Sequence, residues 1–249
     1  MSDFALDRNA IERFHQDGVL GPFEAVSPDA MAPIRAAIED HVLGVDDGPQ
    51  DGVPVHDRHR DHPAVAELAT HPAIIDRMAS IYGPDLLLWA THFWDKPPGG
   101  AEIPWHQDGN FWAIEPPLTI SAWVAIDHVT VENACVNVIP GSHRERLPHV
   151  PAPPETGFEE MADPATFDPG AALRMELAPG EFFLFTERTL HQSNPNESDR
   201  RRLGMSMRVT VPFVSIDHET LYDGHRATVV AGEDWQGIND TEPPLDRSD

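Results

Sequence analysis

The sequence has little of several residue types, and each shortage excludes a class of protein. Its only cysteine is Cys135, so it forms no internal disulfide, and we expect this residue to serve as a small apolar side chain. It has no apolar run of about 18 residues, so we expect no membrane span. Residues 1–8 lack the basic and apolar regions of a secretory signal. Together these absences favour a cytoplasmic protein.

Basic side chains are also scarce. There are 17 Lys and Arg against 42 Asp and Glu, which gives a formal net charge of −25 at pH 7. Such a surface repels nucleic acid and anionic membranes, so we expect neither of those partners. The charge suits solubility, and attraction of cationic substrates is the alternative. The 249 residues suffice for a single domain with a substantial core, residues 1–249, while no feature indicates the oligomeric state.

Helical signals dominate the first 85 residues. A short amphipathic stretch, 10–16, ends at Gly18. Ser27 and Pro28 are typical of a helix start, and the apolar stripe that follows ends at Gly44. A third helix is predicted over 72–82. We therefore expect a helical layer over about 1–85.

From Leu86 the apolar period becomes two, which predicts strands over 86–94, 118–127, 181–185 and 202–211. Helices followed by many antiparallel-looking strands indicate a mainly β fold with flanking helices. The expected architecture is a double-stranded β-helix (a cupin-like jelly roll), with its core over about 86–215 and the helical layer outside.

Two segments lack periodicity. Residues 144–170 are rich in proline and acidic residues, and a loop of that length in a compact domain is often a lid. The acidic tail, 233–249, is expected to be loosely held.

The segment Trp105-His106-Gln107-Asp108-Gly109 offers an imidazole and a carboxylate two residues apart. On a strand, both would point to one face and could reach one ion. His191 follows an apolar strand, and Arg202 comes eleven residues later. Two His and one carboxylate form the facial triad of non-haem Fe(II) oxygenases, and an Arg behind it suits a carboxylate cosubstrate. Arg201 and Arg202 must face opposite sides of a strand, so at most one can bind that carboxylate.

The chain resembles the phytanoyl-CoA dioxygenase family. The resemblance rests on motifs spread over roughly 84–211: Lys96-Pro97-Pro98, His106-Gln107-Asp108, Ile139-Pro140-Gly141-Ser142-His143, Ala178-Pro179-Gly180-Glu181, and His191-x-Ser193 with Arg202. One departure is Ala134, which stands where the family usually has glycine in Glu-Asn-Gly.

The resemblance implies roles for individual residues. His106, Asp108 and His191 match the iron ligands, and Arg202 matches the residue that binds the distal carboxylate of 2-oxoglutarate. Ser193, Trp123 and His92 match the lining of that cosubstrate site. The implied cofactors are Fe(II), 2-oxoglutarate and O2, and the implied reaction is hydroxylation of an unactivated C–H bond of a small-molecule substrate. Chlorinating relatives replace the ligand carboxylate by a small residue, whereas this chain keeps Asp108.

Three aromatic residues near the motif, Trp94, Phe111 and Trp112, are either a substrate pocket or part of the core. Gln107 lies between two ligands and is a neighbour of the site on the opposite face. Two other readings stay open. A zinc hydrolase could use the same ligands, although no general base of the HExxH kind is present. A jelly-roll binding protein without catalysis would not need three ligands and an Arg.

Overall fold

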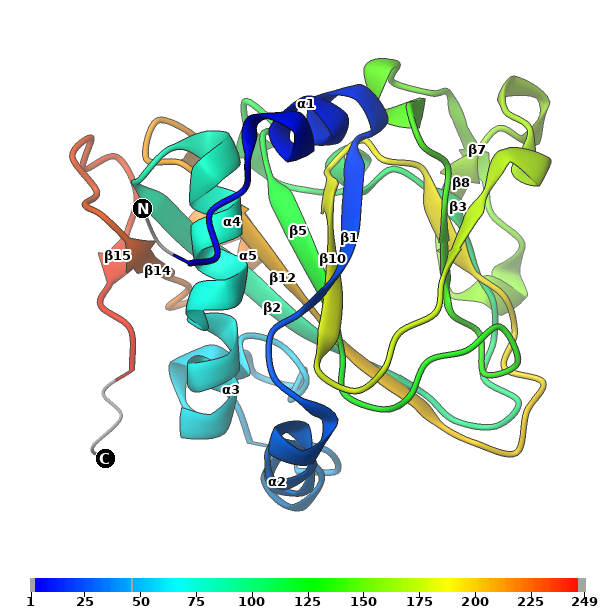
Figure 1. Cartoon of the computed structure of the whole chain (residues 1–249), viewed down its shortest axis with the longest axis horizontal. Helices are drawn as coiled ribbons and strands as arrows, with labels where there is room; N and C mark the ends of the chain where they lie inside the picture. The colour runs from blue at the N-terminus through cyan, green and yellow to red at the C-terminus, as the bar shows by residue number, and fades with distance from the viewer. Residues whose placement is uncertain (1–2, 46, 246–249) are drawn as a thin grey trace.

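The computed structural model describes residues 3–45 and 47–245. A seven-stranded sheet runs through its centre, in the order β1-β10-β5-β12-β2-β14-β15 (Figure 1). Neighbouring strands are antiparallel except β14 and β15. The strands are β1 (Val19–Glu24), β2 (Leu86–Lys96), β5 (Ile120–Ala125), β10 (Glu181–Thr186), β12 (Arg202–Thr210), β14 (Ala227–Ala231) and β15 (Thr241–Glu242).

A second sheet of four strands, in the order β3-β11-β6-β9, faces the first. Its strands are β3 (Ile103–His106), β6 (Val136–Val138), β9 (Leu173–Met175) and β11 (His191–Ser193). Apolar side chains from both sheets, such as Trp123 and Phe183 from the large one and Val136 and Val138 from the small one, form one buried cluster between them. Two facing antiparallel sheets with non-sequential strand order are the jelly roll that the sequence predicted.

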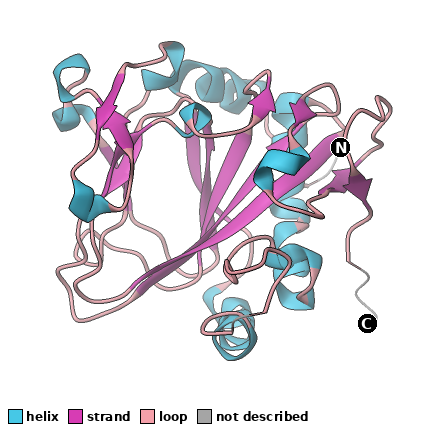
Figure 2. Ribbon diagram, turned by 180° about the vertical axis from the view of Figure 1, so that it is seen from behind, coloured by secondary structure: helices cyan, strands magenta, loops and turns pink. Residues whose placement is uncertain are grey.

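The helices cover the other face of the large sheet. They are α1 (Arg8–Asp17), α2 (Pro28–His41), α3 (Pro63–Ala69), α4 (Pro72–Tyr82) and the short α5 (His218–Leu221). α3 and α4 lie one above the other along the sheet (Figures 1 and 2). The main core joins Met31, Ile38 and Met78 of the helices to Met205 and Met207 of β12. No described helix is long and apolar enough to span a membrane.

The alternation predicted for β12 is confirmed. Leu203, Met205, Met207 and Val209 are buried in the helix-side core, so Arg202, Ser206 and Arg208 point toward the second sheet. β2 and β5 flank this strand in register, with Ser206 opposite both His92 and Trp123. Consequently three adjacent strands present their polar residues to one space between the sheets.

Some segments differ from expectation. β1 interrupts the region expected to be helical and forms an edge of the large sheet, and α3 was not predicted. The segment 144–170 holds a two-stranded hairpin, β7 (His149–Pro151) with β8 (Glu160–Ala162), instead of irregular loop only. Strands β4 (Ile114–Glu115) and β13 (Ser215–Ile216) form another small pair.

The C-terminal segment is described to residue 245, and 246–249 lie outside the described residues. Within it, β15 pairs with β14, and Glu242 accepts two hydrogen bonds from Arg60, at 2.7 Å from Nε and 3.1 Å from Nη2. Both contacts tie the chain near residue 242 to the body of the molecule, in a tail that the sequence predicted to be loosely held.

Candidate active site

Three ligand-type side chains meet at the rim of the second sheet. His106 ends β3, His191 begins β11, and the two residues lie opposite each other in the antiparallel pair. Asp108 Oδ1 is 3.4 Å from His106 Nε2 and 3.9 Å from His191 Nε2. One ligand atom from each residue lies within 4.8 Å of the others, and no other such group of His, Cys, Asp or Glu occurs in the described part of the chain.

The structure brings the three predicted residues together, but not by the expected strand geometry. β3 stops at His106, and Asp108 begins a 3-10 turn, Asp108–Asn110, so the two side chains do not share a strand face. The turn is anchored by the Gly109 N–H, which donates to Glu187 O at 2.8 Å. A Cβ on Gly109 would approach Glu187 Cγ to 3.1 Å, so this close backbone approach favours glycine.

Gln107 points away from the ligands and braces the turn. Its Nε2 donates to Arg188 O at 2.6 Å and to Glu145 O at 2.9 Å, and its Oε1 accepts from Leu147 N at 2.9 Å. The expected neighbour of the site therefore supports the turn by joining it to two later segments of the chain, near residues 145–147 and 188.

The hydrogen bonds of the two imidazoles suit metal binding. His106 Nδ1 lies 2.8 Å from Pro104 O, and His191 Nδ1 lies 2.9 Å from Thr189 O. A carbonyl oxygen can only accept, so each Nδ1 carries the proton and each Nε2 presents a lone pair toward Asp108. Backbone carbonyls that fix the tautomer in this way are typical of histidines that bind metal.

Burial keeps these ligands in the protonation states that a metal requires. It lowers the pKa of His191 to about 4, so this imidazole is neutral near pH 7. For Asp108, burial alone would raise the pKa, but the neighbouring His191, His106 and Arg208 together hold it well below its usual range. A neutral imidazole and an ionised carboxylate are the forms that coordinate a cation.

Arg202 supplies a buried positive charge in the same cavity. Its side chain is 1% exposed, its Nη1 donates to Ala134 O at 3.2 Å, and its guanidinium lies 5.3 Å from the Trp123 ring. Its buried Nε has no hydrogen-bond partner among the described residues. Burial lowers its pKa only to about 10, so it stays charged at neutral pH. A buried cation without an anion suits a carboxylate ligand.

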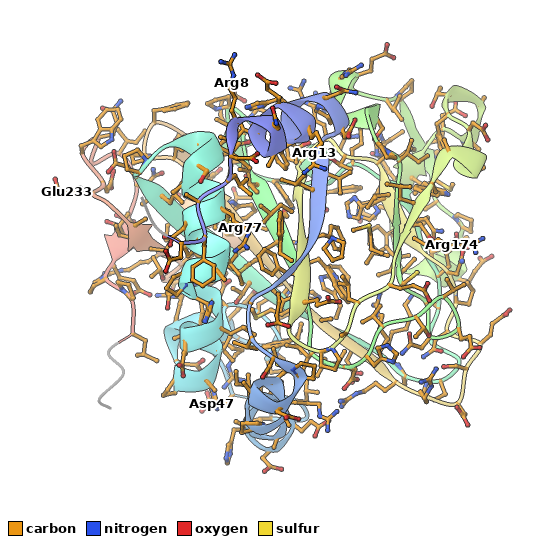
Figure 3. The ribbon with its side chains drawn as sticks, in the orientation of Figure 1. Arg8, Arg13, Asp47, Arg77, Arg174 and Glu233 are labelled. Atoms are coloured by element: carbon orange, nitrogen blue, oxygen red, sulfur yellow. The ribbon has the colours of Figure 1, made fainter. Side chains whose placement is uncertain are left out.

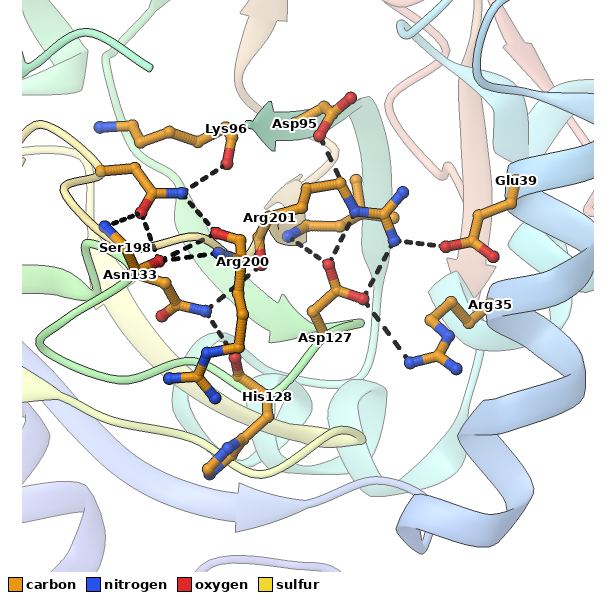
Figure 4. Close-up of polar contacts among 12 residues, drawn as sticks. Arg35, Glu39, Asp95, Lys96, Asp127, His128, Asn133, Ser198, Arg200 and Arg201 are labelled. Carbon is orange, nitrogen blue, oxygen red and sulfur yellow. Dashed lines mark hydrogen bonds and ion pairs between the residues drawn. The ribbon is translucent and has the colours of Figure 1, made fainter. Parts of the chain in front are cut away.

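Arg201 faces the opposite side of the strand, as the alternation requires. It bonds Asp127 at 2.9 Å from Nε and 3.0 Å from Nη2, and it also pairs with Glu39 of α2 (Figure 4). Its partners are supplied by the protein surface, whereas Arg202 has no carboxylate within bonding distance among the described residues. Of the two neighbours, only Arg202 is placed to receive a ligand.

Ser193 and Lys96 extend the Arg202 end of the cavity. Lys96 is the only lysine of the sequence, and it donates from Nζ to Ser193 Oγ at 2.8 Å and to Asn194 O at 2.8 Å. Burial, followed by repulsion from Arg202, lowers its pKa to about 7. Since Ser193 Oγ accepts from Lys96, its own hydroxyl proton is free to be donated into the cavity.

The cavity joins the ligand cluster to the Arg202 end. Its lining combines polar and apolar side chains of both sheets: Trp94, Ile103, His106, Asp108, Trp123, Val136, Phe185, His191, Gln192, Ser193, Arg202, Ser206 and Arg208. His92 is not part of the lining but packs edge-on against Trp94, with ring centroids 4.2 Å apart. Trp94 is fixed by donating from Nε1 to Ser206 Oγ at 3.0 Å.

The other two aromatic candidates lie outside the cavity lining. Phe111 is 44% exposed, and its ring centroid is 6.1 Å from that of His106. Trp112 packs against Trp89 at 5.0 Å, on the wall of the core. Phe158, in the 144–170 segment, comes closer to the ligands, at 5.1 Å from the His106 ring.

Three residues near the site were not among the predicted site residues. Arg208 lies on the same strand face as Arg202, and Lys96 belongs to the Lys-Pro-Pro motif, but the sequence assigned neither of them to the site. Phe158 carried no signal, because only the fold of the hairpin brings it above His106.

Comparisons with known proteins identify the family of the chain. The family model described as phytanoyl-CoA dioxygenase matches residues 14–204, which is more than half of the chain. The chain belongs to the phytanoyl-CoA dioxygenase family. Among curated members, dioxygenase lolE1 of Epichloe uncinata is 28% identical over 141 residues, covering 57% of this chain and 52% of that protein. The chain thus spans about half the length of that relative.

Two solved structures of the same fold are also similar. The non-haem monooxygenase ThoJ, in its apo form, has a TM-score of 0.81 at 26% identity, covering 94% of this chain and 88% of that one. CytC3 with Fe(II) and α-ketoglutarate has a TM-score of 0.77 at 25% identity, covering 97% and 95%. A jelly roll with a helical layer is therefore the architecture of this family member and of its structural neighbours.

Proposed function

We propose that this family member is an Fe(II)- and 2-oxoglutarate-dependent dioxygenase that hydroxylates an unactivated C–H bond of a small molecule. The observation that carries the proposal is one cavity that holds both a buried His-Asp-His cluster and a buried arginine without a carboxylate partner among the described residues. The similarity to CytC3, solved with Fe(II) and α-ketoglutarate, supports the same pair of ligands here.

The two ends of the cavity would bind the metal and the cosubstrate carboxylate, respectively. His106, Asp108 and His191 would hold the metal through two neutral Nε2 atoms and one carboxylate. Arg202 would bind the 5-carboxylate of 2-oxoglutarate, and Ser193 would donate a hydrogen bond to it. When bound, the iron supplies O2 activation coupled to loss of CO2 from the cosubstrate.

The proposed reaction balances without another oxidant. One oxygen atom of O2 enters succinate and the other enters the product, while 2-oxoglutarate and the substrate each give up two electrons. Trp94, Phe185 and Val136 make the cavity walls largely apolar, which excludes water from the reacting atoms.

A zinc hydrolase is the first alternative. It would need a general base beside the metal, yet Asp108 is the only carboxylate among the residues that line the cavity. A non-catalytic binding protein is the second alternative, and it leaves unexplained why both Nδ1 atoms are fixed so that both Nε2 atoms converge.

Anaerobic titration tests the proposal. Fe(II) plus 2-oxoglutarate should give a visible charge-transfer band with one iron per chain. His191→Ala should lose that band while remaining folded by circular dichroism. His128→Ala, which removes an exposed imidazole, is the matched control and should keep it. A wild-type protein that gives no band, or a His191→Ala variant that gives a full one, would refute the assignment.

Turnover tests the finer claim. A metabolite screen for substrate-stimulated succinate formation should identify the substrate, and 18O2 should label its product with one oxygen atom. A product that carries chlorine at high chloride, or one that is oxidised without incorporating oxygen, would contradict hydroxylation.

A further inference from the structure

A second, half-buried arginine opens onto the cavity, and the function proposed above gives it no role. Arg208 lies six residues after Arg202 on the same face of β12. Its side chain forms no hydrogen bond with any described residue, and its Nε is fully enclosed. It also lies after residue 204, where the match to the family model ends.

Two neighbouring strands place further unpartnered polar atoms beside it. Ser121 of β5 is opposite Arg208 in register, is 1% exposed, and its Oγ has no hydrogen-bond partner among the described residues. His92 of β2 lies opposite Ser206, one step along the same face, and its buried Nδ1 is also without a partner there. Paired positions of this kind bring side chains within about 5 Å at Cβ.

The residues paired with Arg208 on the neighbouring strands are small. Arg208 is flanked by Ser121 on one side and by Ala90 on the other. Its guanidinium is held from a third side by Trp112, at 4.9 Å from the ring centroid. The Arg208 guanidinium is therefore fixed in orientation, while its N–H groups have no hydrogen-bond partner among the described residues.

No described carboxylate lies within ion-pair distance of Arg208, and its Nε has no hydrogen-bond partner. A divalent metal, Asp108, Arg202 and the two carboxylates of 2-oxoglutarate would together be neutral. Asp57 is the other carboxylate whose field reaches Arg208, but its two oxygens accept from the Thr91 N–H at 2.7 Å and the Tyr222 hydroxyl at 2.6 Å, and neither bonds the guanidinium. A half-buried guanidinium whose donors are unused suits a ligand with a negatively charged group.

We propose that Arg208, with Ser121 and His92, binds an anionic group of the prime substrate, a carboxylate or a phosphoryl group, beside the metal. This inference rests on the function proposed above, and it names the substrate class. The backbone positions of Arg202 and Arg208 are about 20 Å apart along the strand. The Arg202 guanidinium lies near the Trp123 ring, and the Arg208 guanidinium lies near the Trp112 ring. The cosubstrate and the substrate anion would thus have separate arginines.

The test is a binding experiment on the full chain, loaded anaerobically with Fe(II) and 2-oxoglutarate. The probes are butanoate, hexanoate, phenylacetate and methylphosphonate, and the methyl esters of the three carboxylates are the neutral controls. Binding is read by calorimetry and by the shift of the charge-transfer band. We expect at least one anion to bind roughly tenfold more tightly than its neutral counterpart.

The variants assign that preference to one side chain. Arg208→Gln should weaken the anion about tenfold or more and leave the affinity for 2-oxoglutarate within about threefold, because the lost bond is charge-assisted. Arg208→Lys should restore part of the binding, and it also serves if Arg208→Gln does not fold. Arg174→Gln removes the same charge from the exposed strand β9 and should change nothing (Figure 3).

Each other outcome overturns the proposal. If Arg208→Gln weakens 2-oxoglutarate instead of the anion, Arg208 serves the cosubstrate. If esters bind as well as carboxylates, or if no probe binds, the site does not select an anion. These failures are distinct from failure of the proposed function, in which the wild-type protein would form no charge-transfer band at all.

Discussion

At the scale of single residues, Arg201 and Arg202 show how one step along a strand separates surface from site. The Arg201 guanidinium meets Asp127 and Glu39 outside the sheet, whereas Arg202 is 1% exposed and faces the cavity. Both charges are in the sequence as a run of three arginines, which by itself resembles a solvated turn. Strand alternation is what distinguishes them.

We predict that Arg202→Leu weakens 2-oxoglutarate binding about ten- to a hundredfold, because a charge-assisted hydrogen bond contributes roughly 1.5–3 kcal/mol. Arg201→Leu is the matched control and should leave this affinity within about twofold. Titration of the anaerobic Fe(II) protein with 2-oxoglutarate measures both. If Arg201→Leu weakens 2-oxoglutarate binding more than Arg202→Leu does, Arg202 is not the residue that binds the 5-carboxylate.

Ala134, which stands where the family usually has glycine, has an unusual backbone conformation. It adopts φ +71°, in the left-handed region that favours glycine, and its carbonyl accepts the bond from Arg202. The preceding Asn133 holds the turn, since its Oδ1 accepts from Thr130 N at 2.7 Å and its Nδ2 donates to His128 O at 2.8 Å. The turn is thus kept although its third residue has a Cβ.

We predict that Ala134→Gly raises the free energy of unfolding by about 1 kcal/mol, because relief of the left-handed strain exceeds the entropy cost of glycine. Ala36→Gly, at an exposed position inside α2, should lower it by about the same amount. Urea unfolding of both variants gives the comparison. Destabilisation by both glycines would mean that the Ala134 turn is unstrained.

At the scale of elements, periodicity predicted the jelly roll and most of its central strands. The helix at 72–82 has the predicted bounds, and the alternation of β12 placed Arg202 and Arg208 on one face. Two things were beyond the sequence. β1 is short and carries a glycine and a proline, so its strand character comes from pairing with β10. The ligand geometry depends on a 3-10 turn at Asp108 that no periodic pattern encodes.

The 144–170 segment combines a predicted role with an unpredicted structure. Its hairpin, β7 with β8, carries Phe158 at the turn, where the ring lies 5.1 Å from His106 and 6.3 Å from Phe111. Phe167, farther along, packs on Trp105 at 5.6 Å. Aromatic contacts thus attach the hairpin directly over the metal ligands, as a cover over the substrate would require.

We predict that this hairpin is a mobile lid that closes over bound substrate. Limited proteolysis should cut first near its tip, within 152–157, because most residues of this segment are exposed. Addition of Fe(II), 2-oxoglutarate and substrate should slow that cut several-fold. Equal rates with and without the ligands would indicate a passive surface loop.

At the scale of the whole molecule, the cavity and the protein as a whole carry charges of opposite sign. The chain has a formal net charge of −25, yet the cavity is lined by two arginines and one carboxylate. Salt screens the repulsion among surface carboxylates, but it screens the charges inside the cavity much less. Net charge therefore says little about the ligand, because the cavity is lined mainly by positive side chains although the protein as a whole is negative.

Burial also makes the fold sensitive to acid. His59 is 3% exposed, its Nδ1 lies 2.9 Å from Thr91 Oγ1, and its Nε2 is without a partner among the described residues. Burial lowers its pKa from 6.5 to about 4, against the opposing attraction of Asp57. The folded protein thus keeps this imidazole neutral, while the unfolded chain takes up a proton near pH 6.5.

We predict that His59 contributes stability that is fully present above pH 6.5 and is lost as the pH falls toward 4. Between these values the unfolded state binds one more proton, so the free energy of unfolding falls by about 1.4 kcal/mol per pH unit from this residue. His59→Asn keeps a polar atom near Nδ1 but cannot titrate, so its unfolding free energy should fall less steeply than that of the wild type. Urea unfolding at half-unit steps from pH 7.5 to 4.5 measures the difference, in which the contribution of surface carboxylates cancels. Parallel curves would show that His59 is not a neutral buried group, because only a group whose pKa differs between the two states can change the slope.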